Sequence, residues 1–116
     1  MARHRKSLVK PRSIAFTKQN GRCFYCNQPM WFGNPLEFAS RHNITIGQAK
    51  LLMCTGEHLK AHKDGGKADH SNIVAACWYC NHNRHRRKNP PEPEQYKHQI
   101  QDRMSQGGWH SVRLNY

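Results

Sequence analysis

Hydrophobic residues along this chain occur in short runs separated by polar turns, and each run predicts a small element. The longest uninterrupted apolar run is Ile73–Cys80, and residues 73–76 are suited to a short buried strand. Residues 54–59 predict another short strand. Residues 78–87 contain no Gly or Pro, and their basic residues gather at the C-terminal end, where the helix dipole favours them. This last segment therefore predicts a helix.

Capping and stop signals predict four more helices. A serine opens the first and a glycine ends it, an Asn-Pro pair opens the second, a Thr-x-x-Gln capping box precedes the third, and a Gly-Gly pair ends the fourth. We expect these helices at residues 13–20, 35–42, 49–53 and 94–105. Residues 63–67 have the composition of a loop.

The hydrophobic core that these elements can build is thin. Leu, Ile, Val and Phe together supply 18 of the 116 residues, and the net charge is +12. A chain this charged and this poor in bulky apolar residues is expected to stay disordered unless another interaction stabilises it. Three Trp, four Tyr, five Cys and nine His are residues that pack or bind metals. We therefore expect one small domain stabilised by a metal ion.

Positive charge is concentrated in two parts of the chain. Lys and Arg number 19 against 7 Asp and Glu, residues 1–22 carry seven basic and no acidic residues, and a second basic block spans 84–88. A net positive charge of this size usually indicates a polyanionic partner, and nucleic acid is the commonest one. For the first dozen residues, a solvated and mobile tail explains the charge equally well.

The sequence predicts a cytoplasmic protein without a membrane partner. No run approaches the about 18 apolar residues of a membrane span, and the basic N-terminus lacks the apolar segment of a signal peptide. In a reducing compartment, paired cysteines are more often metal ligands than disulfides.

Four of the five cysteines form two Cys-x-x-Cys pairs, Cys23 with Cys26 and Cys77 with Cys80. Two intervening residues let a tight turn direct both thiolates at one ion, as tetrahedral Zn²⁺ requires. A structural zinc contributes about 10–16 kcal/mol of apparent binding free energy, which is the scale needed to offset a thin core. Unrelated buried cysteines or redox pairs are the alternative. Cys54 is left over, and we expect a small buried hydrophobe there, with a role as a substitute ligand as the second interpretation.

A second group of polar residues lies between the two cysteine pairs and directly after the second pair, and five of the nine histidines fall between positions 58 and 85. Asn81 and His85 are four residues apart, so on a helix they share a face and can reach the same ion. Glu57 and His58 are adjacent, so on a strand their side chains point to opposite sides. Separate roles fit these two residues better: one would bind a cation, and the other would contact a water molecule.

The order of these motifs resembles the HNH endonuclease family, the ββα-metal or His-Me finger nucleases. The resemblance rests on Glu57-His58, Gly65-Gly66, the stretch Ser71–Asn81, the basic block 84–88 and the upstream knuckle Cys23–Cys26. It implies an α+β fold, a small zinc-stapled ββα-metal domain with extra helices. It also implies a division into a basic flexible arm (1–12), a nuclease domain (13–91) with an insertion at 31–53, and a C-terminal helical extension (92–116).

The resemblance implies a metal-dependent endonuclease that hydrolyses phosphodiester bonds of DNA, with RNA as the alternative substrate. His58 falls at the general base, which takes a proton from the attacking water. Asn72 falls at the central Asn that orients the base-bearing loop. Glu57 and Asn81 fall at metal-ligand positions, and His85 falls where some members have a second helical ligand. The cation, Mg²⁺ or Mn²⁺, would stabilise the transition state and the leaving oxygen.

Two positions depart from the usual family pattern. Glu57 stands where the family usually has Asp, and the extra methylene moves the carboxylate. Asn81 stands where the third signature residue is often His, and its amide oxygen suits a hard cation such as Mg²⁺. His62 offers a competing metal pair with His58 if residues 60–63 are helical, but the Gly-Gly loop close behind disfavours that interpretation.

The basic block after the last cysteine supplies candidate phosphate contacts, namely Arg84, Arg86, Arg87 and Lys88. A solvated cationic helix end is the alternative for each of them. For the whole chain, the alternatives to a nuclease are a non-catalytic zinc-stabilised nucleic-acid-binding module and a small regulatory module. Glu57-His58 combined with Asn72 and Asn81 favours the nuclease, because a binding module needs neither a base nor a hard-metal ligand.

Overall fold

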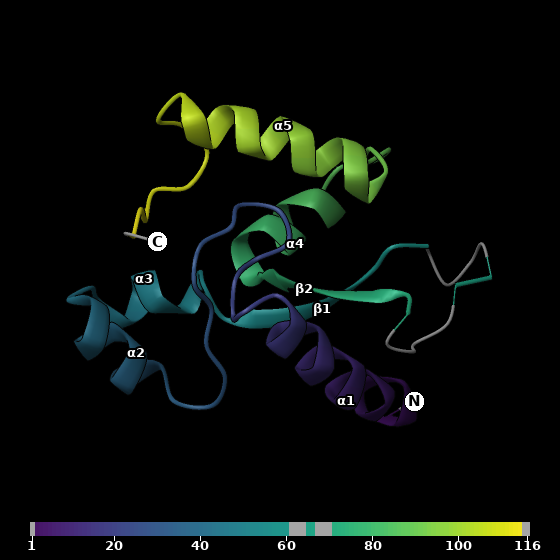
Figure 1. Cartoon of the computed structure of the whole chain (residues 1–116), viewed down its shortest axis with the longest axis horizontal. Helices are drawn as coiled ribbons and strands as arrows, with labels where there is room; N and C mark the ends of the chain where they lie inside the picture. Colours follow the sequence, from purple (N-terminus) through teal and green to yellow (C-terminus); the bar gives the residue numbers. More distant parts are fainter. Residues whose placement is uncertain (1, 61–64, 67–70, 115–116) are drawn as a thin grey trace.

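The computed structural model describes residues 2–60, 65–66 and 71–114, and it has an α+β fold built around one short β-hairpin (Figure 1). The elements in chain order are α1 (Ala2–Lys18), α2 (Pro35–His42), α3 (Ile46–Lys50), β1 (Cys54–His58), β2 (Ile73–Cys77), α4 (Trp78–His85) and α5 (Pro93–Ser105). The hairpin is followed directly by a helix, which confirms the predicted fold class. In the part of the chain described here, no helix is long and apolar enough to cross a bilayer.

The hairpin pairs its two strands antiparallel, with Cys54 opposite Cys77 at one end and His58 opposite Ile73 at the other. Helix α4 begins where β2 ends, because Cys77 is its N-cap and the Cys77 Sγ accepts a hydrogen bond from the Cys80 backbone N–H at 3.4 Å. The second cysteine pair is therefore built from the junction between the hairpin and its helix.

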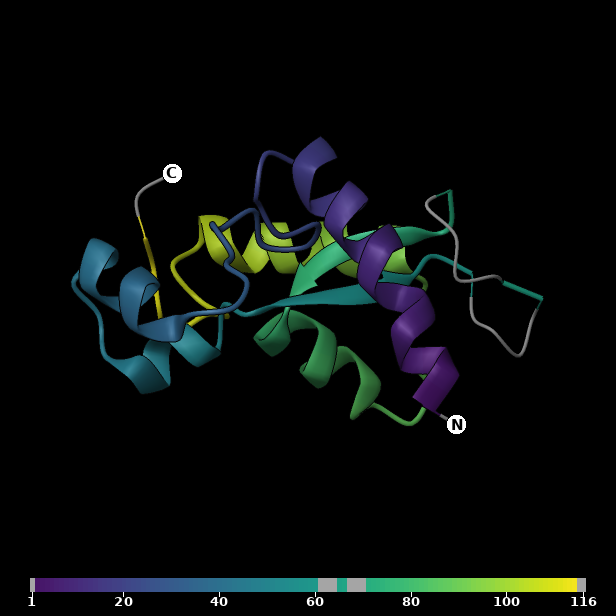
Figure 2. The ribbon, with the colours of Figure 1, turned by 90° about the horizontal axis from the view of Figure 1, so that it is seen from below.

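The hairpin lies between α1 on one face and α4 and α5 on the other, and Figure 2 shows α1 crossing both strands. A Cβ added at Gly56 would lie 3.6 Å from Ile73 Cγ2 and 3.7 Å from Arg12 Cβ, so the face of Gly56 is covered by α1. On the opposite face, the Asn81 amide of α4 donates to Thr55 Oγ1 at 2.9 Å. Alternate residues of β1 are thus directed at different helices.

Helix α1 begins earlier than the sequence predicted. Residues 2–12, predicted as a flexible arm, belong to the same helix as the segment that follows them. Ser13, predicted as the cap, lies inside the helix, and its hydroxyl donates to a backbone carbonyl one turn earlier at 3.0 Å. Pro11 also lies inside α1 and removes one backbone donor. Packing against the hairpin offsets this cost, since Ala15 is buried in the core.

The two helices of the 31–53 insertion begin at the predicted caps. Asn34 is the N-cap of α2, and its Oδ1 accepts a hydrogen bond from a backbone N–H of the first turn at 2.9 Å. The capping box before α3 is complete, because Thr45 Oγ1 accepts from the Gln48 N–H at 3.0 Å and Gln48 Oε1 accepts from the Thr45 N–H at 2.9 Å. Helix α3 starts directly after Thr45 rather than at residue 49, since a capping residue adjoins the helix that it caps.

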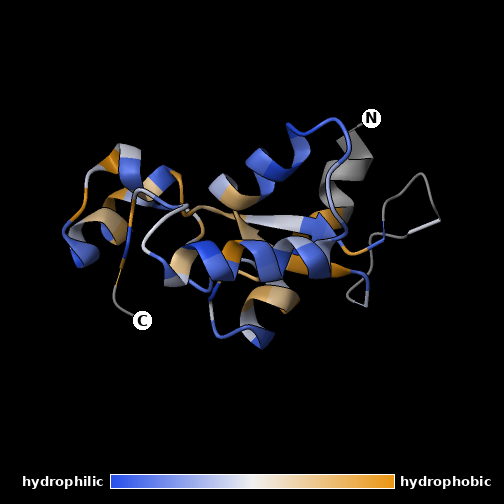
Figure 3. Cartoon of the chain, turned by 90° about the horizontal axis from the view of Figure 1, so that it is seen from above, coloured by the Kyte–Doolittle hydropathy of each residue, from blue (hydrophilic) through white to orange (hydrophobic). Residues whose placement is uncertain are grey.

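The core is small and is rich in cysteines and aromatic rings. Tyr25, Leu52, Tyr96 and Ile100 are among its largest fully buried side chains. Helix α5, predicted at 94–105, contributes two of them, and Figure 3 shows hydrophobic positions interrupting its mainly hydrophilic ribbon. The helix predicted at 78–87 corresponds to α4. Of the loop predicted at 63–67, only Gly65 and Gly66 are described, and His62 lies outside the described residues.

Replacing Thr45 by Ala removes one half of the capping box, so we expect the free energy of unfolding to fall by about 1 kcal/mol. Urea denaturation followed by circular dichroism measures this change. Thr17→Ala is the matched control, because the Thr17 hydroxyl bonds to the Ser13 carbonyl inside α1 and caps no helix end. Equal losses of stability in the two variants would contradict a specific role for the cap.

Candidate functional site

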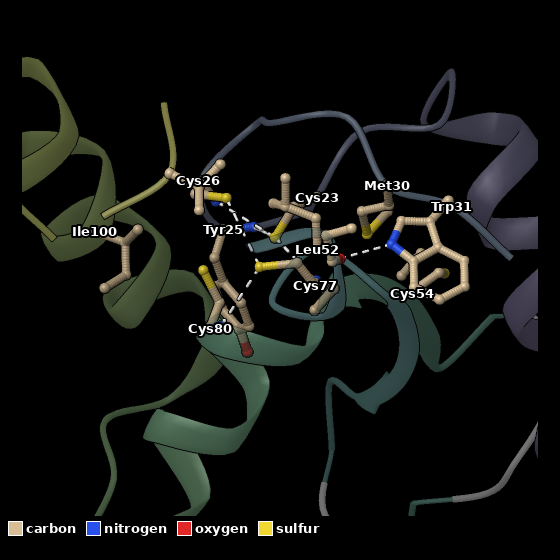
Figure 4. Packing of buried hydrophobic residues seen from close by; sticks show 14 of the residues in the cluster. Cys23, Tyr25, Cys26, Met30, Trp31, Leu52, Cys54, Cys77, Cys80 and Ile100 are labelled. Carbon is tan, nitrogen blue, oxygen red and sulfur yellow. Dashed lines mark hydrogen bonds between the residues drawn. The ribbon is translucent and has the colours of Figure 1, made fainter. Parts of the chain in front are cut away.

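The two Cys-x-x-Cys pairs meet at one buried cluster (Figure 4). All of its sulfur atoms lie within 4.8 Å of one another, and they belong to Cys23, Cys26, Cys77 and Cys80. Zinc–sulfur bonds of about 2.3 Å in a tetrahedron place the sulfurs about 3.8 Å apart, and Cys26 Sγ lies 3.9 Å from Cys77 Sγ. The cluster therefore fits a structural Zn²⁺, and the predicted convergence of the two pairs is confirmed.

Cys54 is buried apart from this cluster, beside Trp31 (Figure 4). Burial raises the pKa of the Cys54 thiol to about 12. Its sulfur does not belong to the set that converges within 4.8 Å, so Cys54 behaves as the small buried hydrophobe that the sequence predicted.

The electrostatics of the cluster call for a cation. Burial opposes ionisation of Cys23, but hydrogen bonds from neighbouring thiols hold its pKa well below the usual value. Burial and hydrogen bonding to Cys23 raise the pKa values of Cys77 and Cys80. Backbone N–H groups of Tyr25 and Cys77 also donate to Cys23 Sγ, at 3.3 and 3.2 Å. Ionisation of Cys77 and Cys80 as well would require the positive charge of a metal ion bound in the cluster.

The C-terminal segment 109–114 packs against the same cluster. The Trp109 indole N–H donates to Cys80 Sγ at 3.3 Å, and His110 Nε2 lies 3.7 Å from Cys77 Sγ. Gln28 is fully buried, and its side chain makes two hydrogen bonds to the backbone of this segment at 2.8 and 2.7 Å. The sequence did not indicate these contacts, because the segment has neither a periodic pattern nor a recognisable spacing.

A second polar group lies on the face of β1 that points to α4. Glu57 is only 2% exposed, and its Oε1 lies 2.8 Å from His85 Nε2. The other carboxylate oxygen accepts hydrogen bonds from the Tyr25 hydroxyl at 3.0 Å and from Arg84 Nη1 at 3.3 Å. The structure thus brings together two residues that the sequence predicted as metal ligands, Glu57 and His85.

Asn81, the other predicted ligand, lies one turn before His85 on α4. Its Nδ2 donates to Thr55 Oγ1 at 2.9 Å and to the Gly56 carbonyl at 3.3 Å. Its Oδ1 is buried and has no hydrogen-bond partner among the described residues. A carboxylate oxygen, an imidazole nitrogen and an unpartnered amide oxygen are donor types that a hard divalent cation accepts.

His58 ends β1 beside Glu57, and strand alternation directs the two side chains to opposite faces. The chain after His58 is held by Asn72, whose Oδ1 accepts from the Lys60 N–H at 2.9 Å and whose Nδ2 donates to the Lys60 carbonyl at 3.1 Å. A Cβ at Gly66 would collide with the Lys60 carbonyl and lie 2.8 Å from Asn72 Nδ2, so only glycine fits there.

The hairpin, the helix α4 and the polar residues between them form one continuous stretch of chain. Residues 43–87 match the HNH endonuclease family model. This match identifies an HNH domain and implies a nuclease with a nucleic-acid substrate. Comparisons with curated proteins and with solved structures give no significant match. The first cysteine pair, α1 and α5 lie outside the matched residues.

One predicted phosphate contact of the HNH domain needs correction. Arg84 is 8% exposed, its Nε and Nη2 donate to the Pro91 carbonyl at 3.1 and 2.8 Å, and its Nη1 pairs with Glu57. The Arg84 side chain points from α4 toward the buried Glu57 carboxylate, so its guanidinium makes hydrogen bonds within the protein rather than with a phosphate. Arg86, Arg87 and Lys88 are exposed, and for them the prediction stands untested.

Sequence analysis missed Tyr25 as a member of this site. The residue lies inside the first cysteine pair, where it looked like part of the zinc knuckle alone. Its hydroxyl contacts Glu57, which lies 32 positions further along the chain. Burial and the adjacent carboxylate raise the pKa of Tyr25, so the phenol stays protonated and donates. Tyr25 therefore connects the cysteine cluster with the polar site of the HNH domain.

Replacing Cys23 by Ser removes a zinc ligand, so we expect loss of bound zinc and of the folded structure, because zinc binding and folding are coupled. Metal analysis and circular dichroism measure the two losses. Cys54→Ser is the matched control, and it should keep the zinc content of the wild type. Full zinc occupancy in Cys23→Ser, or zinc loss in Cys54→Ser, would show that the ligand set is wrong.

Proposed function

We propose that this protein is a metal-dependent endonuclease that hydrolyses phosphodiester bonds of DNA. The observation that carries the proposal is the 2.8 Å approach of Glu57 Oε1 to His85 Nε2, directly beside His58, in a hairpin and helix that match the HNH family. In this proposal His58 is the general base, and one divalent cation lies between β1 and α4.

Glu57, His85 and Asn81 would hold that cation through one oxygen or nitrogen atom each. Two of the three donors are oxygen atoms, which favours Mg²⁺ or Mn²⁺ over softer metals. When bound, the cation neutralises the charge that develops on the phosphoryl group and on the leaving oxygen. His85 lies on the solvent side of this site, because its side chain is 58% exposed and so accessible to a substrate phosphate.

Tyr25 and Arg84 position the Glu57 carboxylate for this role. They hold Oε2 by hydrogen bonds and leave Oε1 directed at His85. Arg84 is itself fixed by the Pro91 carbonyl, so its guanidinium cannot swing away easily. A glutamate has one more rotatable bond than an aspartate, and these two contacts offset the extra freedom of the longer side chain.

His58 and Asn72 serve the proton-transfer half of the reaction. His58 is half-buried and lies on the strand face opposite Glu57, so the base does not compete with the ligand for the cation. Asn72 ties both backbone groups of Lys60 to the start of β2, and this contact fixes the chain that carries His58. The neutral imidazole can then take a proton from water as the water attacks phosphorus.

Replacing His58 by Ala removes the proposed base, so nicking of supercoiled plasmid should fall about 100-fold or more. The assay compares Mg²⁺, Mn²⁺ and EDTA, and zinc is quantified in each protein. His98→Ala is the matched control, because His98 is an exposed residue of α5. Equal nicking by wild type and His58→Ala would show that the base is wrongly assigned. Salt-dependent DNA binding without nicking by the wild type would instead favour the non-catalytic binding module.

Replacing Tyr25 by Phe removes one hydrogen bond to Glu57, so the affinity of the second metal site for Mn²⁺ should fall about tenfold while zinc content stays the same. Titration calorimetry of the zinc-loaded protein with Mn²⁺ measures the affinity. Tyr79→Phe is the matched control, because the Tyr79 hydroxyl donates to the Trp109 carbonyl instead. Unchanged Mn²⁺ affinity in Tyr25→Phe would rule out the positioning role.

A further inference from the structure

A cleft of about 830 Å³ lies between α4 and α5. Three arginines, three amide side chains and one carboxylate line it together with aromatic rings, and these polar members are Asn83, Arg86, Arg87, Gln99, Asp102, Arg103 and Gln106. Helix α5 lies outside the residues that match the HNH family, so the family match does not account for the α5 side of this surface. We call it the α4–α5 cleft.

The α4–α5 cleft is on the other side of α4 from the proposed catalytic residues. Each residue turns an α-helix by about 100°, so Asn81 and His85 project roughly 160° away from Asn83. Arg87 follows the end of α4 and lines the cleft together with Asn83. The cleft and the catalytic site therefore occupy two faces of one helix, and a change in the cleft leaves the catalytic donors in place.

The charge in the cleft is positive and largely uncompensated. Arg87 and Arg103 form no ion pair within the described part of the chain, and Arg86 makes only a 3.4 Å hydrogen bond to Asn83. Asp102 is the one carboxylate among the described lining residues. Guanidinium groups that converge without carboxylate partners form a strong binding site for phosphate oxygens.

Trp109 lines the cleft, and its contacts hold this part of the surface in one conformation. Its backbone φ is +75°, a left-handed value that is rare and strained for a bulky residue. The Tyr79 hydroxyl holds its carbonyl at 3.0 Å, and Cys80 Sγ holds its indole N–H at 3.3 Å. The Arg103 guanidinium carbon lies 5.5 Å from the centre of the Trp109 ring, so the ring helps to position that charge.

We propose that the α4–α5 cleft binds the phosphate backbone of a nucleic acid, as a second contact surface that flanks the cut. This proposal rests on the proposed function, because the nucleic acid in the cleft is taken to be the same DNA substrate that is cleaved beside His85. A helix is about 10–12 Å across, and phosphates of one strand follow each other every 3.4 Å or so along a duplex. A strand cut beside His85 therefore reaches the cleft within roughly three to four phosphates.

The test measures DNA binding separately from cleavage. In the His58→Ala background, with Mg²⁺ present, the dissociation constant for a fluorescein-labelled duplex is measured over a range of salt concentrations. Arg87→Ala and Arg103→Ala should each weaken binding about tenfold near 0.1 M salt and reduce the slope of log K against log salt by about 0.9. Arg103→Lys keeps the charge and should keep the slope. Lys50→Ala removes the same charge from an exposed residue of α3 that does not line the cleft, and it should change neither quantity.

With His58 intact, Arg87→Ala and Arg103→Ala should raise KM and retain kcat. Thermal unfolding of every variant identifies any loss of folding, and Arg87→Ala remains informative if Arg103→Ala unfolds. Unchanged binding in both arginine variants, or an equal loss in Lys50→Ala, would overturn the inference even if the wild type cleaves DNA. If the wild type does not cleave but the arginine variants bind more weakly, the proposed function fails and the cleft assignment stands.

Discussion

Four buried thiols can share one small space only if a cation compensates the charge that they acquire when they ionise, and this constraint organises the whole fold. The cluster joins the loop after α1, the end of the hairpin, the first turn of α4 and the segment after α5. The aliphatic core is too thin to hold these parts together alone. Zinc bound by the four cysteines would supply the stability that a larger apolar core supplies in other domains of this size.

The polar site proposed to be catalytic is connected to this cluster at two points. Tyr25 lies inside the first cysteine pair and holds the carboxylate of Glu57. Cys77 ends β2 and caps α4, so the cysteine cluster also sets where the helix that carries Asn81 and His85 begins. The proposed structural and catalytic metal sites would thus be coupled, because the contacts that order the cysteine cluster also position Glu57, Asn81 and His85.

Features encoded by neighbouring residues or by a recognisable spacing of ligands could be predicted from the sequence, and contacts between distant residues without such a pattern could not. The Asn34 and Thr45 caps, the cysteine pairs and the hairpin followed by a helix depend on local spacing, and the structure has them where expected. Arg84 looked like its basic neighbours, but a carboxylate 27 positions away determines its role. Helix α1 passes through Pro11 because tertiary packing outweighs a local helix breaker.

The order of the ligands along the chain has a consequence for synthesis. Cys26 and Cys77 are separated by 51 positions, so at about 5–20 residues per second the second pair follows the first by roughly 3–10 s. During this interval the first pair can offer a metal only two thiols, and no helix α4 exists to shield them. The nascent chain therefore carries an open dithiol, vulnerable to oxidation, until the last of the ligands and the segment that covers them have been made.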